Sequence, residues 1–242
     1  MRTSGLTRPI TIFTPSFADE DSTNAQDLTV KEIVARLPPE WFRVTMISEG
    51  TADPRIAARP NTKLLPYYNH GNAAQLLMRS LLSVPDVYFY PRHGPLDRAW
   101  FALRKNLRVR TAVVTHIVMV MNEATAKGLV ARSIIEGDAV FANSAYVAET
   151  VQQNFGIRAE TMYNGIDRRY FFPGNRSSKA NGNSGALTVL YAGSFQARKR
   201  VELVIQQAAR WPNVTFRLAG RGETETACQD LVHELGCQNV VF

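Results

Sequence analysis

Residues 111–121 read TAVVTHIVMVM, and this run decides the fold class. Its first half is almost continuously apolar and β-branched, a composition typical of a parallel strand that is covered on both faces. Elsewhere in this half of the chain, apolar residues recur at helical spacing between short apolar runs; Val30, Ile33, Val34 and Leu37 are one example. Strands that alternate with helices predict an α/β fold with a parallel sheet. The other strands of this half are expected at 10–14, 42–47, 61–65, 87–90 and 139–142.

The alternation stops and then restarts further along the chain. Residues 164–186 are rich in Gly, Asn and Ser, which is typical of a linker. After them we expect strands at 187–192, 214–219 and 240–242, with helices at 198–210 and 225–235. The sequence therefore predicts a Rossmann-like domain over 1–163, a hinge or linker over 164–186, and a second Rossmann-like domain over 187–242. Because such domains usually have about five or six strands, we expect the second to be incomplete and the chain to be a fragment.

Composition excludes several classes of protein. The chain has 242 residues, 45% of them hydrophobic, and no apolar run approaches the roughly 18 residues of a membrane-spanning helix. The N-terminus lacks the apolar core of a signal peptide, so we expect a cytoplasmic protein. Cys228 and Cys237 lack metal-ligand spacing and are predicted to be free thiols. We also expect helices at 72–82 and after Ser144, which would cap the second one. A surface loop is expected at 175–186.

The net charge of +7 is concentrated in part at residues 98–110, RAWFALRKNLRVR. Basic and apolar side chains alternate there at rough helical spacing. One interpretation is a helix that covers a sheet with its arginine stems along apolar surface. The other is peripheral contact with an anionic membrane, which would place the protein at the inner face of the membrane. Nucleic acid is not expected, because no recognition module accompanies the charge.

The turn after the strand at 187–192 reads AGSFQARKR, at 192–200. Ligands of open parallel sheets bind outside the carboxyl ends of the strands. Gly193 would let a ligand approach the backbone, and Arg198, Lys199 and Arg200 fall at the start of the predicted helix. Cations are unfavourable at that end of a helix dipole, so an anion such as a diphosphate would offset them. The alternative is that these side chains face water or acidic groups.

Other motifs are weaker or incomplete. AGRGETET at 219–226 contains Gly220 and Gly222, but Glu225 occupies the third position of the G-x-G-x-x-G fingerprint, which disfavours a nicotinamide-dependent dehydrogenase. His116 lies inside an apolar strand, where it is either a hydrogen-bonded core residue or a functional one. The sequence contains no P-loop and no Ser-His-Asp arrangement, which disfavours a nucleotide triphosphatase and a serine hydrolase. It also contains no cluster of metal ligands, so we expect no metal site.

Longer stretches resemble a known family. GDAVFANSAYVAETVQQNFGI at 137–157, NGIDRRYFFP at 164–173 and YAGSFQARKRVELVIQQAARWPNVTFRLAGRGETE at 191–225 are similar to family-four retaining glycosyltransferases, which have the GT-B fold. The resemblance implies an acceptor-side domain followed by a donor-binding domain. It also implies that Asn164 and Gly165 belong to the hinge between them.

The resemblance assigns roles to several residues. Lys199 matches the lysine that grips the donor diphosphate, six residues after Gly193. Ser194 replaces the family's usual arginine, so Arg198 or Arg200 would have to supply that charge, and Gly220 is expected near the donor. His116 matches the active-site histidine, which contacts the transferred sugar. Thr23 and Asn24 stand in the substrate loop, where two glycines are common in the family. The acidic E-x7-E segment of the family is expected beyond Phe242.

The implied activity is metal-independent transfer of a hexose, with retention, from a nucleotide-diphosphate-sugar to a glycan or lipid acceptor. The nucleotide-sugar is then a substrate, so no cofactor is expected. Two alternatives stay open: a non-catalytic module that binds a nucleotide or sugar, and a nucleotide-sugar epimerase with the same architecture.

Overall fold

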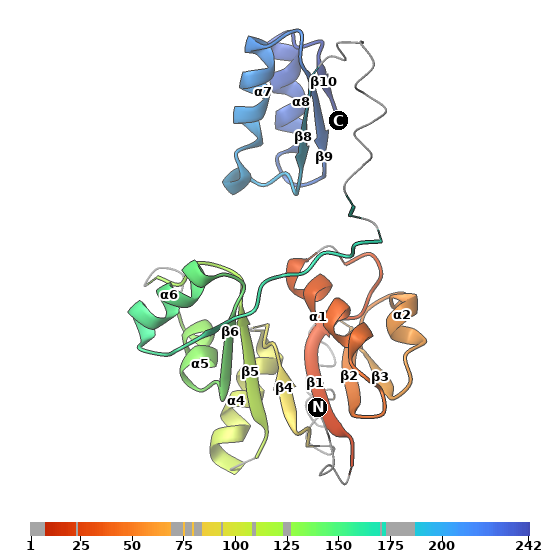
Figure 1. The fold of residues 1–242 in the computed structure, drawn as a ribbon, viewed down its shortest axis with the longest axis vertical. Coiled ribbons are helices and arrows are strands. Elements are labelled where there is room, and N and C mark those ends of the chain that lie inside the picture. The colour runs from red at the N-terminus through yellow and green to blue at the C-terminus, as the bar shows by residue number, and fades with distance from the viewer. Residues whose placement is uncertain are drawn as a thin grey trace. The chain divides into compact units, whose positions relative to one another are not determined.

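The computed structural model describes residues 8–22, 24–68, 75, 79, 84–92, 94–107, 110–122, 127–169, 171–172 and 187–242. They form two compact units, Met1–Asp167 and Arg168–Phe242 (Figure 1). The helix predicted at 72–82 lies outside the described residues except at 75 and 79, and the loop predicted at 175–186 lies outside them entirely. Within the described chain, no helix combines the length and apolar character needed to cross a membrane.

Unit 1 is built on a seven-stranded parallel sheet of order β3-β2-β1-β4-β5-β6-β7. The order changes direction between β1 and β4, and such a switch point is where open parallel sheets bind ligands, at the carboxyl ends of the strands. The strands are β1 (Ile10–Phe17), β2 (Phe42–Ser48), β3 (Thr62–Pro66), β4 (Val87–Phe89), β5 (Ala112–Ile117), β6 (Ala139–Ala142) and β7 (Glu160–Thr161).

The helices of unit 1 begin where the sequence offers a cap. Asn24 accepts a hydrogen bond from the Gln26 amide at 2.8 Å, and Ser144 accepts one from the Val147 amide at 3.3 Å. Each satisfies a free N–H of the first turn. Figure 1 shows α1 and α2 beside β1–β3, and α5 and α6 beside β5 and β6. The helices are α1 (Ala25–Arg36), α2 (Pro54–Ala57), α4 (Pro95–Leu107), α5 (Leu129–Ile135) and α6 (Ala145–Phe155).

The side chains of unit 1 pack on both faces of the sheet. One cluster joins Phe13 and Tyr88 to Trp100 and Phe101 of α4, and the Tyr88 and Trp100 rings stack with centroids 5.1 Å apart. Trp100 is 1% exposed and Phe101 is fully buried. These two aromatic residues of the basic stretch 98–110 therefore belong to the core and cannot insert into a membrane surface. The first interpretation of this stretch, a helix that covers a sheet, describes α4.

Unit 2 has a three-stranded parallel sheet of order β10-β9-β8. Its core joins Phe195 to Val201, Ile205, Leu218 and Cys228. Cys228 and Cys237 are free thiols, as predicted, and burial raises the pKa of Cys228. The elements are β8 (Thr188–Ala192), a 3₁₀ turn η3 (Ala197–Lys199), α7 (Val201–Arg210), β9 (Thr215–Ala219), α8 (Glu225–Glu234) and β10 (Val240–Val241).

The start of α7 differs from the prediction. The helix expected from Arg198 begins at Val201, because Arg200 has a left-handed backbone with φ of 53° and separates η3 from α7. Arg198 and Lys199 consequently lie in η3, just before the helix, and Arg200 occupies the N-cap of α7, so the predicted first helical turn is shifted by three residues. The prediction of an α/β protein with parallel, Rossmann-type sheets is confirmed.

Candidate functional site

His116 lies near the carboxyl end of β5 and is 2% exposed. Neither of its ring nitrogens has a hydrogen-bond partner among the described residues. Burial lowers the pKa of His116, and the nearby backbone of Met162 opposes that shift without making a well-formed hydrogen bond to the ring. The imidazole is therefore neutral at pH 7, with one nitrogen free to donate and the other free to accept.

Two neighbouring strands also end in unpaired polar atoms. Tyr90 follows β4 directly and is 3% exposed, and its hydroxyl has no partner in the described part of the chain. Asn143 follows β6, and its buried Oδ1 is also unpaired there. Leaving a buried polar group unpaired costs about 1–3 kcal/mol. The residues that carry these atoms lie at the carboxyl ends of three adjacent strands, β4, β5 and β6, the edge at which open parallel sheets bind ligands.

A cavity of about 500 Å³ opens beside the ends of β1 and β2. Asp27, which is 1% exposed, lies in the first turn of α1 and accepts hydrogen bonds from the Phe17 amide, the Ser22 hydroxyl and the Arg92 guanidinium. The Arg92 guanidinium also lies over the Phe17 ring, 4.6 Å from its centroid. Four carboxylates and one guanidinium line the cavity, whose residues are Phe17, Asp19, Asp21, Ser22, Asn24, Asp27, Glu49, Gly50 and Arg92.

The predicted substrate loop borders this cavity only in part. Asn24 lines it, but its side-chain oxygen caps α1. Thr23 lies outside the described residues. Contact of Asn24 with a substrate therefore stays a prediction, to be made by its amide group while its oxygen holds the helix.

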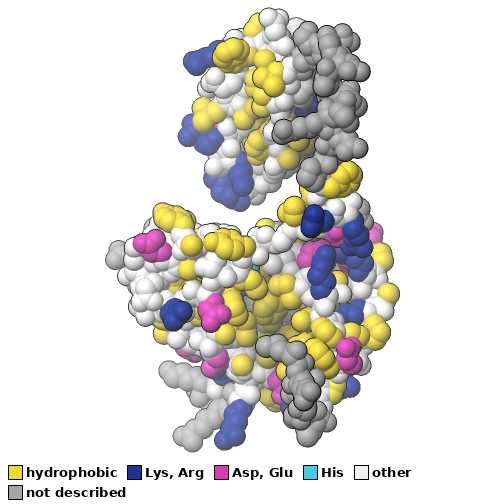
Figure 2. Space-filling model, in the orientation of Figure 1, with side chains coloured by type: hydrophobic (Ala, Val, Ile, Leu, Met, Phe, Trp, Pro, Cys, Tyr) yellow, Lys and Arg dark blue, Asp and Glu magenta, His cyan; other side chains and the backbone are white. Residues whose placement is uncertain are grey.

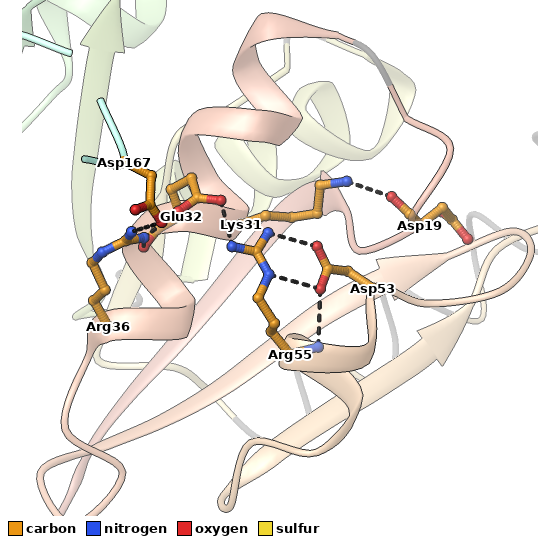
Figure 3. Close-up of polar contacts among 7 residues, drawn as sticks. All are labelled: Asp19, Lys31, Glu32, Arg36, Asp53, Arg55 and Asp167. Carbon is orange, nitrogen blue, oxygen red and sulfur yellow. Dashed lines mark hydrogen bonds and ion pairs between the residues drawn. The ribbon is translucent and has the colours of Figure 1, made fainter. Parts of the chain in front are cut away.

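Polar contacts around α1 fix the walls of the cavity (Figure 3). The buried Lys31 ammonium donates to the backbone oxygen of Asp19 at 2.5 Å. The Asp19 carboxylate in turn accepts from the Ser48 hydroxyl at 2.8 Å and the Gly50 amide at 2.6 Å. The loop after β1 is thereby tied both to α1 and to the loop after β2.

A chain of ion pairs continues along the same helix. Glu32 contacts both Arg36 and Arg55, and Arg55 clasps the Asp53 carboxylate at 2.8 Å (Figure 3). Arg36 also reaches Asp167, at 3.5 Å. Glu32, Arg36 and Arg55 are half-exposed, so each ion pair adds little to the stability of the fold. Together the ion pairs connect α1 with α2 and with the end of unit 1.

In the described part of the chain, neighbouring side chains engage the basic residues Arg198 and Arg200 of the turn after β8 but not Lys199. Arg198 donates to the Gln196 side chain at 3.0 Å, and Arg200 pairs with Glu202 at 2.5 Å. Lys199 is exposed, and its ammonium has no hydrogen bond or ion pair among the described residues. Figure 2 shows Lys and Arg side chains on the surface of unit 2. Of the cations predicted to bind the donor, Lys199 is therefore the one that an incoming anion could take without breaking a contact.

Gly193 and Ser194 are held in the same turn. The Gly193 amide donates to Ala219 O at 2.9 Å, and Ser194 O accepts from the Tyr191 hydroxyl at 3.0 Å. Ser194 is exposed, so its own hydroxyl is open to a ligand. Neither contact shows donor binding, which stays a prediction for both residues.

Gly220 has a steric reason to be glycine. A Cβ there would lie 1.9 Å from Gly193 O, and one at Gly222 would lie 2.3 Å from Phe195 O. The turns after β8 and β9 are thus packed backbone against backbone, which only residues without a side chain allow. The structure gives Gly220 a packing role, and its predicted donor contact is a separate question.

Asn164 and Gly165 are exposed and belong to neither a helix nor a strand. They lie in unit 1, shortly before the division between the units at Asp167 and Arg168. Their hinge role stays a prediction. As for metals, the described part of the chain contains no group of three or more His, Cys, Asp or Glu side chains arranged to hold an ion.

Sequence reasoning missed Tyr90, Asp27, Arg92 and Asn143. A signal was present for one of them, because Asn143 follows directly after the strand predicted at 139–142, at the edge where such sheets bind ligands, whereas Tyr90 was the last residue of the strand predicted at 87–90. Asp27 and Arg92 carried no local signal, since only the pairing of β1 with β4 brings their chain segments together.

Comparison with known proteins gives the class. The chain matches Glycosyltransferase Family 4 over residues 26–170, which is more than half of its length, and it belongs to that family. The protein is a glycosyltransferase with the GT-B fold. A comparison with curated proteins finds no match.

Solved structures share the fold at low identity. The apo form of the lipopolysaccharide outer core galactosyltransferase WaaB is 16% identical with a TM-score of 0.61, covering 96% of this chain and 67% of its own. Anabaena Alr3699/HepE in complex with UDP is 14% identical with a TM-score of 0.66, covering 97% and 68%. A putative UDP-N-acetylglucosamine 2-epimerase from Listeria monocytogenes is 11% identical with a TM-score of 0.56, covering 98% and 69%. These likenesses are likenesses of fold.

Proposed function

We propose that the protein transfers a hexose from a nucleotide-diphosphate-sugar to a glycan or lipid acceptor, with retention at the anomeric carbon and without a metal ion. Membership of Glycosyltransferase Family 4 supports the reaction class. The observation that carries the site is His116, a buried imidazole near the carboxyl end of β5 whose two nitrogens have no hydrogen-bond partner among the described residues and whose pKa is lowered by burial. An imidazole buried only for packing would be expected to have a partner.

On the donor side, the enzyme must help a nucleoside diphosphate to leave the transferred sugar. As the glycosidic bond loosens, positive charge grows on the sugar ring and negative charge on the leaving phosphate. The uncommitted Lys199 ammonium would stabilise that phosphate, with Arg198, the Ser194 hydroxyl and the backbone near Gly193 beside it. A charged donor aimed at developing negative charge is typically worth about 3 kcal/mol in the transition state.

At the edge of unit 1 where polar atoms are unpaired among the described residues, His116 would contact the transferred sugar, as the resemblance implies, and neighbouring groups would hold hydroxyl groups of the acceptor. Neutral His116 can donate one hydrogen bond and accept another, which suits a hydroxyl group. The cavity lined by Asp19, Asp27 and Glu49 would exclude anionic groups, because an added negative charge there would lie beside carboxylates. We therefore expect a neutral, hydroxyl-rich acceptor group at this edge.

UDP-sugars are the first donors to test, because one protein with the same fold was solved with UDP. The experiment is titration calorimetry of the chain, and of its gene's full-length product, with UDP, GDP and ADP. Binding of one nucleotide by the full-length product supports a nucleotide-sugar donor. If neither protein binds any of the three, the donor proposal is wrong and only the fold and family stand.

Activity separates the remaining readings. The full-length product is incubated with the matching nucleotide-hexose and an oligosaccharide or lipid acceptor, and His116→Ala is compared with wild type. We expect a loss of at least 100-fold in kcat/KM, the scale of a misplaced or missing active-site group. An NMR assay of the anomeric product, repeated with EDTA, tests retention and metal independence.

The epimerase reading predicts a different product. The fold is shared with an epimerase, so fold alone does not choose between the activities. A nucleotide-sugar isomer formed without any acceptor would indicate epimerisation. Tight nucleotide binding with no product of either kind would indicate the non-catalytic module, for which Ser194, in place of the family's arginine, is the motivating residue.

The proposed contact of residues 98–110 with an anionic membrane rests on charge alone, since Trp100 and Phe101 are in the core. Co-sedimentation with anionic and neutral vesicles tests the contact. Equal binding to both would count against an electrostatic anchor.

A further inference from the structure

Tyr90 has an unusual backbone, with φ of 57°, immediately after β4. In a regular strand, Tyr88 and Tyr90 would point to the same face, because side chains alternate. Tyr88 does pack against Phe13 and Trp100 on the α4 side. Tyr90 instead packs with Val30 and Val34 of α1. The left-handed conformation has therefore turned the Tyr90 ring to the opposite face of the sheet.

Specific contacts hold this conformation. The Tyr90 amide donates to Val114 O on β5 at 2.8 Å. The Tyr90 carbonyl accepts from the Gln26 side chain at 3.0 Å, and the same amide group reaches the Ser16 hydroxyl at 3.4 Å. Gln26 lies in the first turn of α1, so one side chain links the ends of β1 and β4 at the switch point of the sheet. Left-handed conformations are strained for aromatic residues and persist only where such contacts impose them.

The turned ring meets His116. The two rings approach edge to face, with centroids 5.3 Å apart and planes at 64°. Both side chains are almost fully buried, and the Tyr90 hydroxyl is unpaired among the described residues. Because neither ring nitrogen has a well-formed hydrogen bond among the described residues, packing orients the imidazole, and the Tyr90 ring is an aromatic group packed against it.

We propose that Tyr90 is a positioning residue for His116: its ring, held in the left-handed conformation by Gln26, fixes the plane of the imidazole and keeps water from it. This inference rests on the proposed function only for its effect on transfer. The geometry itself can be tested without a substrate.

The test is histidine NMR on the whole chain, labelled with ¹³C and ¹⁵N at histidine. The chain has four histidines, and His116→Ala assigns the resonance of interest. Tyr90→Leu removes the ring, Tyr90→Phe keeps it, and Phe13→Leu is the matched control on the opposite face of the sheet.

We expect Tyr90→Leu to raise the pKa of His116 toward its ordinary value of about 6.5, because water would reach the imidazole. The shifts that set this pKa in wild type come from burial and from the Met162 backbone, and no charged side chain contributes. Tyr90→Phe and Phe13→Leu should leave the His116 titration as it is in wild type.

The wild-type chain gives a second, independent measurement. Nuclear Overhauser contacts between the Tyr90 and His116 ring protons support the proposal even if Tyr90→Leu fails to fold. Absence of these contacts overturns it, as does an unchanged His116 titration in a folded Tyr90→Leu variant.

Transfer kinetics then separate the two proposals. In the full-length product, Tyr90→Leu should lower kcat/KM by about 100-fold, as misplacement of an active-site group does. The Tyr90→Phe variant keeps the ring and should have a kcat/KM close to that of the wild type. If His116→Ala leaves transfer unchanged, the proposed role of His116 fails, while the NMR result still decides whether Tyr90 positions it.

Discussion

At the scale of single residues, the donor side depends on a cation with no other task. Lys199→Ala removes the one ammonium of η3 that is uncommitted in the described structure. We expect kcat/KM for transfer to fall by roughly 100-fold to 1000-fold, because negative charge on the leaving diphosphate loses a donor worth about 3 kcal/mol. Initial rates of the full-length product with its nucleotide-sugar measure this.

Two further variants make the Lys199 result specific. Lys199→Arg keeps the charge and should retain much of the rate, although the shapes of the two cations differ. Arg210→Ala removes an exposed cation at the far end of α7 and should change nothing. An equal loss in Arg210→Ala would mean that overall charge, rather than contact with the leaving group, is responsible.

A second residue, Asp53, makes the stability of unit 1 depend on pH. Hydrogen bonds from the Arg55 side chain lower the pKa of Asp53 against the effect of burial. The ionised Asp53 carboxylate therefore stabilises the folded state fully above the pKa of an unfolded aspartate, about 3.9. This stabilisation is lost as the pH falls through the lower pKa that Asp53 has in the folded state. We expect Asp53→Asn to be less stable than wild type at pH 7 by at most about 1 kcal/mol, because Arg55 is half-exposed.

Urea unfolding at pH 7 and at about pH 3 measures the effect of Asp53. The difference between Asp53→Asn and wild type should shrink at the lower pH. Asp230→Asn, an exposed position on α8, is the control and should show no such trend. A difference that grows on acidification would contradict the assignment.

Residue types that carry chemistry were recognisable in the sequence, but their partners were not. His116 was identified by its place in a buried strand and by the resemblance, and the structure adds that its nitrogens have no hydrogen-bond partner in the part of the chain that it describes. Tyr90 could not be found, because alternation along β4 predicts that it shares a face with Tyr88. Its backbone conformation depends on Gln26, which is far away in the sequence and reaches it only across the folded sheet.

At the scale of elements, the two βα turns of unit 2 depend on each other. Gly220→Ala would place a methyl carbon 1.9 Å from the Gly193 carbonyl oxygen, which is much closer than a van der Waals contact allows. One turn would have to move, and overpacking of this kind costs about 1–3 kcal/mol. We expect faster hydrogen exchange in peptides from β8 and β9 of the variant than of the wild type.

Gly236→Ala is the matched control for the Gly220 variant. Gly236 also has a positive φ, of 64°, but a Cβ there would meet nothing within 4 Å. It should cost only the backbone strain, roughly 1–2 kcal/mol. If both variants exchange equally fast in β8, the close approach of the two turns is not what makes Gly220 necessary.

Elements were predictable where periodicity is long, and less so where a single residue breaks them. The strands of both sheets were expected near their observed positions, since apolar runs between helical patterns are a strong signal. The start of α7 was missed by three residues, because a left-handed Arg200 interrupts a stretch that otherwise favours helix. A non-glycine residue in that conformation has no sequence signature.

At the scale of the whole molecule, the chain divides after Asp167, and a resemblance places the hinge slightly earlier, at Asn164 and Gly165. In unit 1, Arg36 contacts Asp167 and so holds the segment that follows this pair against α1. An exposed ion pair at 3.5 Å is worth less than about 1 kcal/mol, which is weak enough to break during a domain movement.

Gly165→Pro tests whether motion at the predicted hinge limits turnover. Proline fixes φ near −65° and also restricts Asn164, so the variant stiffens both residues. If closure about them excludes water and assembles the site, kcat should fall by roughly 10-fold, equivalent to about 1.4 kcal/mol in the barrier. Steady-state kinetics of the full-length product and its melting temperature are measured together.

Gly165→Ala provides the comparison that makes the hinge result interpretable. A Cβ at this position would meet nothing within 4 Å, so alanine should keep both kcat and the melting temperature close to wild type. A slow but thermally stable Gly165→Pro variant then indicates restricted motion, because the fold is intact and no contact was removed. Full activity in Gly165→Pro would show that the units move about another point, and Arg168, where the second unit begins, would be the next residue to stiffen.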